Sequence, residues 1–150
     1  MNISKLNSKT DAPMDLLLLA DPSEELVKSY LNKGTCYTAD INGETVGVVL
    51  IMETKAYTIE VMNLAVKEEF QNKGIGKKLL LYAIEEIKKG DTKTIEIGTG
   101  NPGVVQMLLY QKCGFRIVDI DFDFFRRTHS ERIYENGIEC RDMIRMRIEL

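Results

Sequence analysis

Three runs of strand-forming residues follow one another in the first half of the chain and are joined by short connections. Tyr37–Ile41 and Thr45–Met52 flank Asn42-Gly43. This pair favours a type I′ turn, because both central residues of that turn need a positive φ. A third run, Thr58–Val66, follows after a short loop. The pattern predicts three antiparallel strands in a meander.

The pattern then changes from strand to helix. Apolar residues recur at helical spacing after residue 74, and Gly90 ends the run. A further strand is predicted at Thr94–Gly98. A helix between neighbouring strands carries the chain over the sheet, so the strand after it runs parallel to the strand before it. The sheet is therefore expected to be mixed and mostly antiparallel, with a parallel pair at its centre.

Shorter elements flank this frame. Asp21-Pro22-Ser23-Glu24 is predicted to open a helix that ends at Gly34, with Asp21 as its cap. Asn101-Pro102 is predicted to cap another helix, which runs to Cys113. The other expectations are strands at Leu16–Leu19, 115–121 and 140–150, and an irregular segment at 122–139. The expected fold class is α+β, with residues 1–150 forming a single domain around one mixed sheet flanked by helices.

Composition limits the function classes. The 150 residues are 44% hydrophobic and 29% charged, which is typical of a globular protein with one core. The net charge is −3 and there is no basic block, which argues against nucleic-acid and membrane partners. Cys36, Cys113 and Cys140 are odd in number and widely spaced, so neither a disulfide framework nor a metal site is expected. Without a signal-peptide pattern, the expected compartment is the reducing cytoplasm.

One hexapeptide between the third strand and the long helix has the composition of a ligand-binding loop: Gln71-Asn72-Lys73-Gly74-Ile75-Gly76. Glycine lets the main chain approach a ligand closely, and a helix N-terminus favours negative charge. Such a loop can hold a pyrophosphate through main-chain N–H groups. A Walker loop does not fit, because Lys78 stands where Ser or Thr is needed. A dinucleotide fingerprint does not fit either, because Leu79 replaces its third glycine.

The hexapeptide resembles the Gln/Arg-x-x-Gly-x-Gly/Ala signature of the GNAT superfamily of acetyl-CoA-dependent N-acetyltransferases. The preceding Asn63-Leu64-Ala65-Val66 looks like the strand that enters this loop in the family. Residues 109–115, Leu-Tyr-Gln-Lys-Cys-Gly-Phe, look like a second family signature, a helix end that carries a tyrosine and a Gly-Phe turn. The order of elements from about residue 14 to the end matches as well. The segment 135–143 further resembles a group of small bacterial members.

The resemblance implies a site for acetyl-CoA. The backbone of Leu64, Ala65 and Val66 would bind the pantetheine arm as an added strand. The pyrophosphate would lie in a cradle with extra positive charge from lysines, formed by Gln71, Asn72, Lys73, Gly74, Ile75, Gly76, Lys77 and Lys78. Asn101 stands at another position that often contacts the coenzyme, although a plain helix cap explains it about as well.

The resemblance also implies catalytic roles. Tyr110 stands where the family places a tyrosine that protonates the leaving thiolate; the alternative is a core tyrosine with a satisfied hydroxyl. Glu60 stands where some members, histone acetyltransferases among them, place a glutamate base. It shares a strand face with Met62 and Leu64 only if no bulge intervenes. A surface glutamate is an equal alternative, and many members use no single base. Backbone N–H groups near Leu64–Val66 would stabilise the oxyanion.

The expected activity is direct transfer of an acetyl group from acetyl-CoA to the primary amine of a small-molecule or peptide acceptor, without a metal. The acceptor is open, and so is the choice between a monomer and a homodimer. The alternative is an acetyl-CoA sensor or a non-catalytic partner subunit. Residues 122–139 are rich in aromatic and charged side chains and are predicted to form part of the acceptor pocket. Cys113, His129 and Glu96 are expected to stand outside the chemistry.

Overall fold

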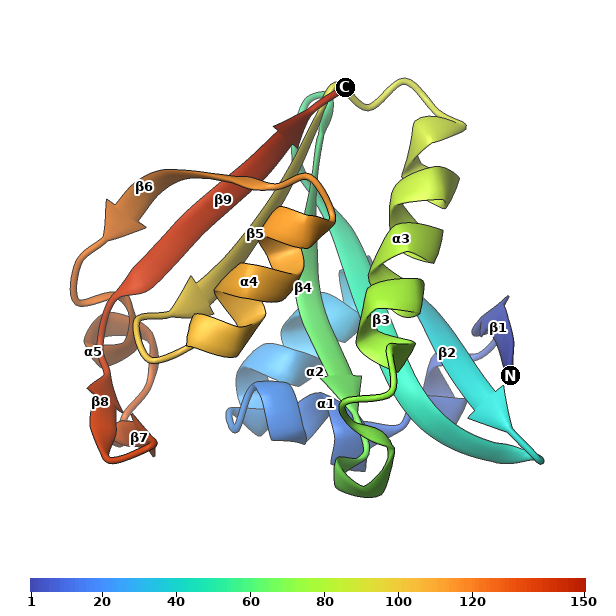
Figure 1. The fold of residues 1–150 in the computed structure, drawn as a ribbon, viewed down its shortest axis with the longest axis horizontal. Helices are drawn as coiled ribbons and strands as arrows, with labels where there is room; N and C mark the ends of the chain where they lie inside the picture. The colour runs from blue at the N-terminus through green and yellow to red at the C-terminus, as the bar shows by residue number, and fades with distance from the viewer.

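The computed structural model describes all residues from Met1 to Leu150. Its main sheet has seven strands in the order β1-β2-β3-β4-β5-β9-β6 (Figure 1). The strands are β1 (Asn2–Lys5), β2 (Thr35–Ile41), β3 (Glu44–Lys55), β4 (Thr58–Val66), β5 (Thr94–Gly100), β6 (Arg116–Asp121) and β9 (Met143–Glu149). A separate two-stranded hairpin is formed by β7 (Ile133–Glu135) and β8 (Ile138–Cys140).

The helices are α1 (Met14–Ala20), α2 (Glu24–Lys33), α3 (Ile75–Lys88), α4 (Val104–Lys112) and α5 (Phe124–Thr128). Short 3₁₀ turns lie at Lys9–Asp11 and Glu68–Phe70. None of the helices is both long enough and apolar enough to cross a lipid bilayer.

The predicted sheet is confirmed. β2 and β3 form a hairpin in which Asn42 and Gly43 both have positive φ, 51° and 79°. β4 has the predicted bounds, and β4 and β5 are the parallel pair, joined by α3. The other neighbours in the sheet are antiparallel. The fold is therefore α+β with one mixed sheet, as the strand pattern indicated.

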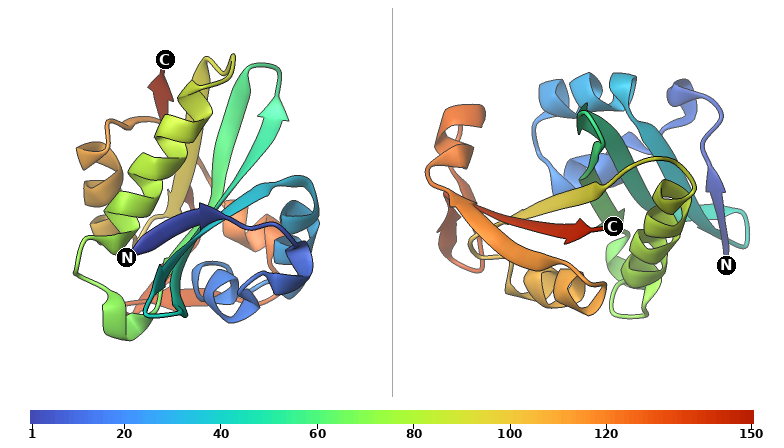
Figure 2. Two further views of the ribbon diagram at one scale, coloured as in Figure 1. Left: turned by 90° about the vertical axis from the view of Figure 1, so that its right-hand side faces the viewer. Right: turned by 90° about the horizontal axis from the view of Figure 1, so that it is seen from above.

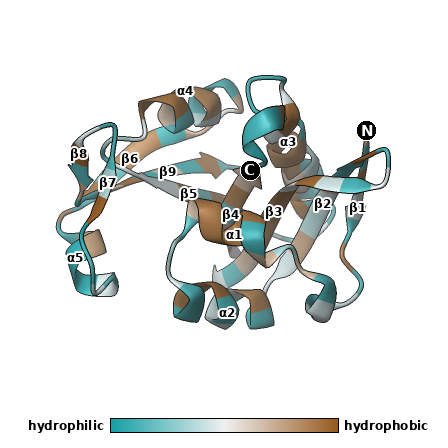
Figure 3. Ribbon diagram, turned by 90° about the horizontal axis from the view of Figure 1, so that it is seen from below, coloured by the Kyte–Doolittle hydropathy of each residue, from teal (hydrophilic) through white to brown (hydrophobic).

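Helices cover both faces of the sheet (Figure 2). α3 lies on one face with α4, and its buried residues Leu79, Leu80 and Ala83 belong to the larger core cluster. α1 and α2 lie on the other face, where Leu17 and Val27 belong to a second cluster. Figure 3 shows these layers from below, with the ribbon coloured by the hydropathy of each residue. The sheet therefore separates two hydrophobic cores.

The strand predicted at Leu16–Leu19 is wrong, because these residues lie in α1. Leu16 and Leu17 are adjacent in the chain and both fully buried. A strand covered on one face would bury only every second residue. The four-leucine run has no periodicity of its own, so packing against β4 decided its conformation.

Two helix caps differ from the prediction. Ser23, not Asp21, caps α2, and its hydroxyl accepts from the main-chain N–H of Leu26 at 3.3 Å. Asp21 instead accepts from the N–H of Ser23 at 3.1 Å. α4 is capped by Gly103 rather than by Asn101-Pro102. The C-terminal prediction for α2 is confirmed, because Gly34 is its C-cap.

The segment 122–139 is more ordered than predicted. It contains α5 and most of the β7–β8 hairpin, whose turn is Asn136-Gly137 with φ of 53° and 75°. This is the same turn chemistry as Asn42-Gly43. The last strand begins at Met143 rather than at residue 140, and β1 was not predicted.

Candidate active site

β4 and β5 pair over only part of their length. Their ladder joins Thr58–Val61 to Thr94–Ile97, and beyond these residues the two strands have no register. A bulge in β4 lies at the same place. Leu50 of β3 pairs with Asn63, while the next residue pairs with Val61, so Met62 is the extra residue. The second half of β4 therefore has an open edge toward β5.

The alternation of β4 shows which peptide groups point to this open edge. The N–H of Lys67 donates to Val46 of β3 at 2.8 Å. Successive residues in a strand turn their peptide groups to opposite sides, so Ala65 also bonds toward β3. Leu64 and Val66 then direct their N–H and C=O groups to the opening. Of the three residues nominated for an added strand, these two turn their main-chain groups to the opening, and the Val66 carbonyl already accepts from the Gln71 side chain.

The loop before α3 presents a row of free donors. The main-chain N–H groups of Asn72 to Lys77 donate to no acceptor in the chain, and the first intrahelical bond runs from Lys78 to Gly74 at 3.1 Å. Asn72 and Gly74 have positive φ, 62° and 83°. Consecutive N–H groups in such a turn form a concave anion site at the helix N-terminus. This arrangement matches the predicted pyrophosphate cradle.

The charge around the loop is positive. Lys73, Lys77 and Lys78 pair with no carboxylate, unlike the lysines elsewhere that form ion pairs. The ammonium of Lys73 lies 5.5 Å from the centroid of the Phe70 ring. The Gln71 side chain turns back and donates to the carbonyl of Val66 at 2.9 Å, which fixes the loop to the end of β4.

Gly76 lies between β4 and α4. A Cβ atom built on it would be 3.7 Å from Val66 and 3.8 Å from Leu109, which are ordinary van der Waals distances. A methyl group therefore fits in the folded protein, and packing alone does not demand glycine here. Gly76 also leaves the row of free N–H donors without a side chain at this position.

Tyr110 lies on α4 and is only 6% exposed. Its ring meets that of Phe115 edge-on, at 6.2 Å between centroids. Burial raises the pKa of Tyr110 to about 12, and Cys113 adds to the shift. The hydroxyl has no hydrogen-bond partner in the chain and is not among the fully enclosed polar atoms. Tyr110 is thus a core residue whose hydroxyl has no partner within the protein, and its role as the acid stays a prediction.

Glu60 lies just before the bulge and on the α1–α2 side of the sheet. It is a register partner of Met52, which packs against the α1–α2 cluster, whereas Leu64 packs against the α3 cluster. The bulge thus puts Glu60 and Leu64 on opposite faces. Arg145 of β9 lies 3.5 Å from the Glu60 carboxylate. Desolvation raises the pKa of Glu60 and Glu96 adds to it, while Arg145 opposes the shift.

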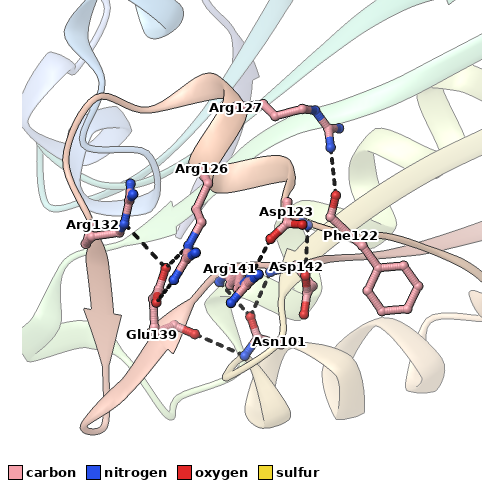
Figure 4. Close-up of polar contacts among 9 residues, drawn as sticks. All are labelled: Asn101, Phe122, Asp123, Arg126, Arg127, Arg132, Glu139, Arg141 and Asp142. Atoms are coloured by element: carbon pink, nitrogen blue, oxygen red, sulfur yellow. Dashed lines mark hydrogen bonds and ion pairs between the residues drawn. The ribbon is translucent and has the colours of Figure 1, made fainter.

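Asn101 follows β5 and binds a segment distant in sequence (Figure 4). Its Oδ1 accepts from the N–H groups of Arg141 and Asp142, at 2.8 and 3.0 Å. Its Nδ2 donates to the carbonyl of Glu139 at 3.1 Å. These bonds hold the connection between β8 and β9, so the side chain is not a helix cap, and its contact with the coenzyme stays a prediction.

Three side chains were expected from the sequence to have no part in the chemistry, and they lie in different parts of the structure. Cys113 is the C-cap of α4, and burial raises the pKa of its thiol. Glu96 is 4.0 Å from Lys55. His129 is half-buried, with its side chain 8% exposed and its Nε2 3.0 Å from Asp21. No cluster of His, Cys, Asp or Glu forms a metal site.

Sequence reasoning missed Asn63, which is 4% exposed and bonds to α1 and α2. An amide within the apolar run from Val61 to Val66 was the available signal.

The sequence and the fold are similar to those of known proteins. A family model described as an acetyltransferase (GNAT) domain matches residues 32–117. The uncharacterized N-acetyltransferase YvbK of Bacillus subtilis (strain 168) is 52% identical, and the match covers both chains completely. The segment 135–143 had indicated this group of small bacterial proteins.

Solved structures agree over the whole chain. An acetyltransferase of Bacillus subtilis in complex with CoA has a TM-score of 0.93 at 52% identity and covers 99% of this chain and 98% of its own. A GNAT acetyltransferase of Elizabethkingia anophelis with acetyl-CoA bound has a TM-score of 0.96 at 47% identity, with coverage of 99% and 97%. An IAA acetyltransferase of Bacillus cereus ATCC 14579 has a TM-score of 0.95 at 50% identity, with 99% of each chain covered. The chain belongs to the GNAT family of N-acetyltransferases.

Proposed function

We propose that the protein transfers an acetyl group from acetyl-CoA directly to a primary amine. The observation that carries this proposal is the row of free N–H donors from Asn72 to Lys77 beside the open edge of β4. The donors and the unpaired lysines suit a diphosphate, and the edge suits an extended amide-containing arm. The relatives with CoA and acetyl-CoA support the same ligand.

Leu64 and Val66 would bind the pantetheine arm through their outward N–H and C=O groups, apart from the Val66 carbonyl that Gln71 already occupies. The same edge offers an N–H to the carbonyl oxygen of the thioester as negative charge develops on it. Ala65 would form no hydrogen bond with the arm, because its own peptide groups point to β3. Asn101 uses its Oδ1, its main-chain N–H and one Nδ2 proton within the protein, so its carbonyl and its second Nδ2 proton are the groups left for the coenzyme.

In the reaction, the amine nitrogen attacks the carbonyl carbon, a C–N bond forms and the C–S bond breaks. The nitrogen must lose a proton and the sulfur must gain one. Tyr110 is proposed as the acid, because its pKa of about 12 keeps it protonated and its hydroxyl is unbonded. Glu60 is proposed as the base through water, because its raised pKa favours proton uptake. We see no side chain arranged as an activated nucleophile, so the proposal includes no acyl-enzyme.

Thiol release from acetyl-CoA in the presence of amines tests this proposal. The panel should hold lysine, spermidine, kanamycin and a peptide with an N-terminal alanine, which represent the acceptor classes left open. We expect release that depends on one of them and a product acetylated on nitrogen by mass spectrometry. Binding of acetyl-CoA by calorimetry without amine-dependent release would identify a sensor or partner subunit instead. Sedimentation of the same sample distinguishes a monomer from a homodimer.

A further inference from the structure

A continuous chain of hydrogen bonds runs from the bulge of β4 to the end of α5. The Nδ2 of Asn63 donates to the carbonyl of Leu17 in α1 and to the hydroxyl of Tyr30 in α2, at 2.8 Å each. That hydroxyl donates to Oδ2 of Asp21 at 3.4 Å. On the other side of Asp21, the Nε2 of His129 lies 3.0 Å from Oδ1.

The chemistry of each group sets the direction of donation. A main-chain carbonyl can only accept, so the amide nitrogen of Asn63 must face Leu17. A carboxylate can only accept, so Nε2 of His129 carries a proton. Burial raises the pKa of Tyr30, so its hydroxyl keeps its proton as well. The donors on both sides therefore converge on Asp21, with no conflict along the chain.

This series of hydrogen bonds joins the two sides of the opening between β4 and β5. α1 lies against β4, and Asp21 is its C-cap. α5 lies against the end of β5, where the ring of Phe125 is 3.4 Å from a Cβ built on Gly100. Both helices lie on the side of the sheet opposite α3 and α4 (Figure 3). The contact between Asp21 and His129 thus bridges the strands where they diverge.

Asn63, the first residue of this hydrogen-bonded series, also has one side-chain atom that lowers stability. The Oδ1 of Asn63 is the one fully enclosed side-chain polar atom without a hydrogen-bond partner. Leaving such an atom unpaired is unfavourable, and a hydrophobic residue at this position would avoid the loss. An amide kept at this cost beside the reaction edge is better explained by what its nitrogen holds than by stability.

We propose that the hydrogen-bonded chain Asn63–Tyr30–Asp21–His129, called here the acceptor-side brace, positions the acceptor amine for attack. It rests on the proposed function. The brace fixes α5, whose Phe124 ring lies 5.1 Å from the guanidinium of Arg145. That guanidinium lies 3.5 Å from the carboxylate of Glu60, the proposed base, so α5 would form one wall of the acceptor side. Its members are positioning residues, which act through the placement of α5 and touch neither acetyl-CoA nor the reacting atoms.

Two substitutions at His129 separate its hydrogen bonds. His129→Gln places an amide nitrogen near the position of Nε2 and can still donate to Asp21. His129→Asn reaches only as far as Nδ1, so it keeps the contact with Thr128, 2.9 Å away, and loses Asp21. Both remove the ring that packs at 5.6 Å from that of Phe125. A role in packing alone predicts the same behaviour for both variants.

Two measurements are made on each variant. One is hydrogen exchange of α5 by mass spectrometry, and the other is steady-state kinetics with the panel amine that is turned over fastest. For His129→Asn we expect about tenfold faster exchange in α5 and about tenfold higher KM for the amine, because one charge-assisted bond is lost. The KM for acetyl-CoA should change less than about twofold, since the coenzyme loop is untouched. His129→Gln should remain close to the wild type in both.

Tyrosine variants give a matched control. Tyr30 and Tyr37 are 6% and 7% exposed, but the hydroxyl of Tyr37 has no hydrogen bond and lies in the other core. Tyr30→Phe should raise the amine KM, while Tyr37→Phe should leave it unchanged.

Equal results for His129→Gln and His129→Asn would overturn the brace, as would faster exchange of α5 without a change in amine KM. If no amine is turned over, the proposed function fails separately. The exchange comparison then decides alone whether the brace holds α5.

Discussion

In the proposed reaction, burial prepares the side chain of Tyr110 to act as an acid. Its ring is enclosed in the core, yet its hydroxyl bonds to no other group. A phenol with a pKa of about 12 holds its proton through the neutral range. Such a group can give a proton to a strongly basic thiolate as that thiolate forms, which is when an acid is needed.

We predict that Tyr110→Phe lowers kcat by about a hundredfold, the usual contribution of a positioned acid, and leaves the affinity for acetyl-CoA nearly unchanged. Stopped-time thiol release and calorimetry measure the two quantities. The ratio of wild-type to variant kcat should stay constant between about pH 7 and about pH 9, because the tyrosine stays protonated. Tyr37→Phe is the control. Equal losses in kcat and affinity would remove Tyr110 from the acid role.

The loop and first turn of α3 form the ligand cradle as one element. Gly74 has a φ of 83°, which an L-residue adopts only with strain, so it serves the turn itself. Gly76 has helical geometry and ordinary neighbours, so its small size serves the space in front of it. These two glycines therefore have different reasons for being glycine.

We predict that Gly76→Leu abolishes detectable binding of CoA while the melting temperature falls by no more than about 5 °C. The side chain would fill the space between β4, α3 and α4 that the coenzyme needs. Gly90→Leu, at the exposed other end of α3, is the control and should bind CoA normally. Calorimetry and thermal unfolding give both numbers; CoA binding by Gly76→Leu at wild-type affinity would contradict the assignment of the loop.

The bulge of β4 is the element that organises the two faces of the site. Without Met62 as an extra residue, Glu60 and Leu64 would share a face. With it, the carboxylate lies on the α1–α2 side while Leu64 packs toward α3. In the proposed reaction, the amine would approach from one side of the sheet and the coenzyme from the other.

The two cores together make the folded protein sensitive to alkali. Burial raises the pKa of Cys36 and Cys140 from 9.0 to about 11, and that of Tyr110 from 10.0 to about 12. Each group binds its proton more tightly when folded. Its contribution to stability is therefore complete below the unfolded pKa and is lost as pH rises through the folded value.

We predict that the free energy of unfolding is steady near neutral pH and falls from about pH 9 upward, with most of the loss between about pH 10 and about pH 12. Urea unfolding in the presence of a reductant measures it. The slope between about pH 9 and about pH 11 should decrease when Cys36 is replaced by Ala. A free energy that stays constant to about pH 11 would show that these thiols and phenols are not protected.

Much of the fold could be predicted because its signals are local. Asn42-Gly43 determines a turn through its own φ preferences, and the helical spacing after Gly74 determines the crossover. Asn136-Gly137 carried the same information and could have been used. The four leucines at 16–19 could not be assigned, because an apolar run without period fits a strand or a helix, and contacts with β4 decide between them.

The candidate site divides in the same way. The loop donors and Tyr110 follow from short motifs, because a glycine-rich turn and a helix end arrange their own backbone. The face of Glu60, the free peptide groups of Leu64 and Val66, and the bond between Asp21 and His129 depend on strand register and on residues 108 positions apart. Local preference carries no information about such pairings, because only the packed sheet and its helices bring those groups together.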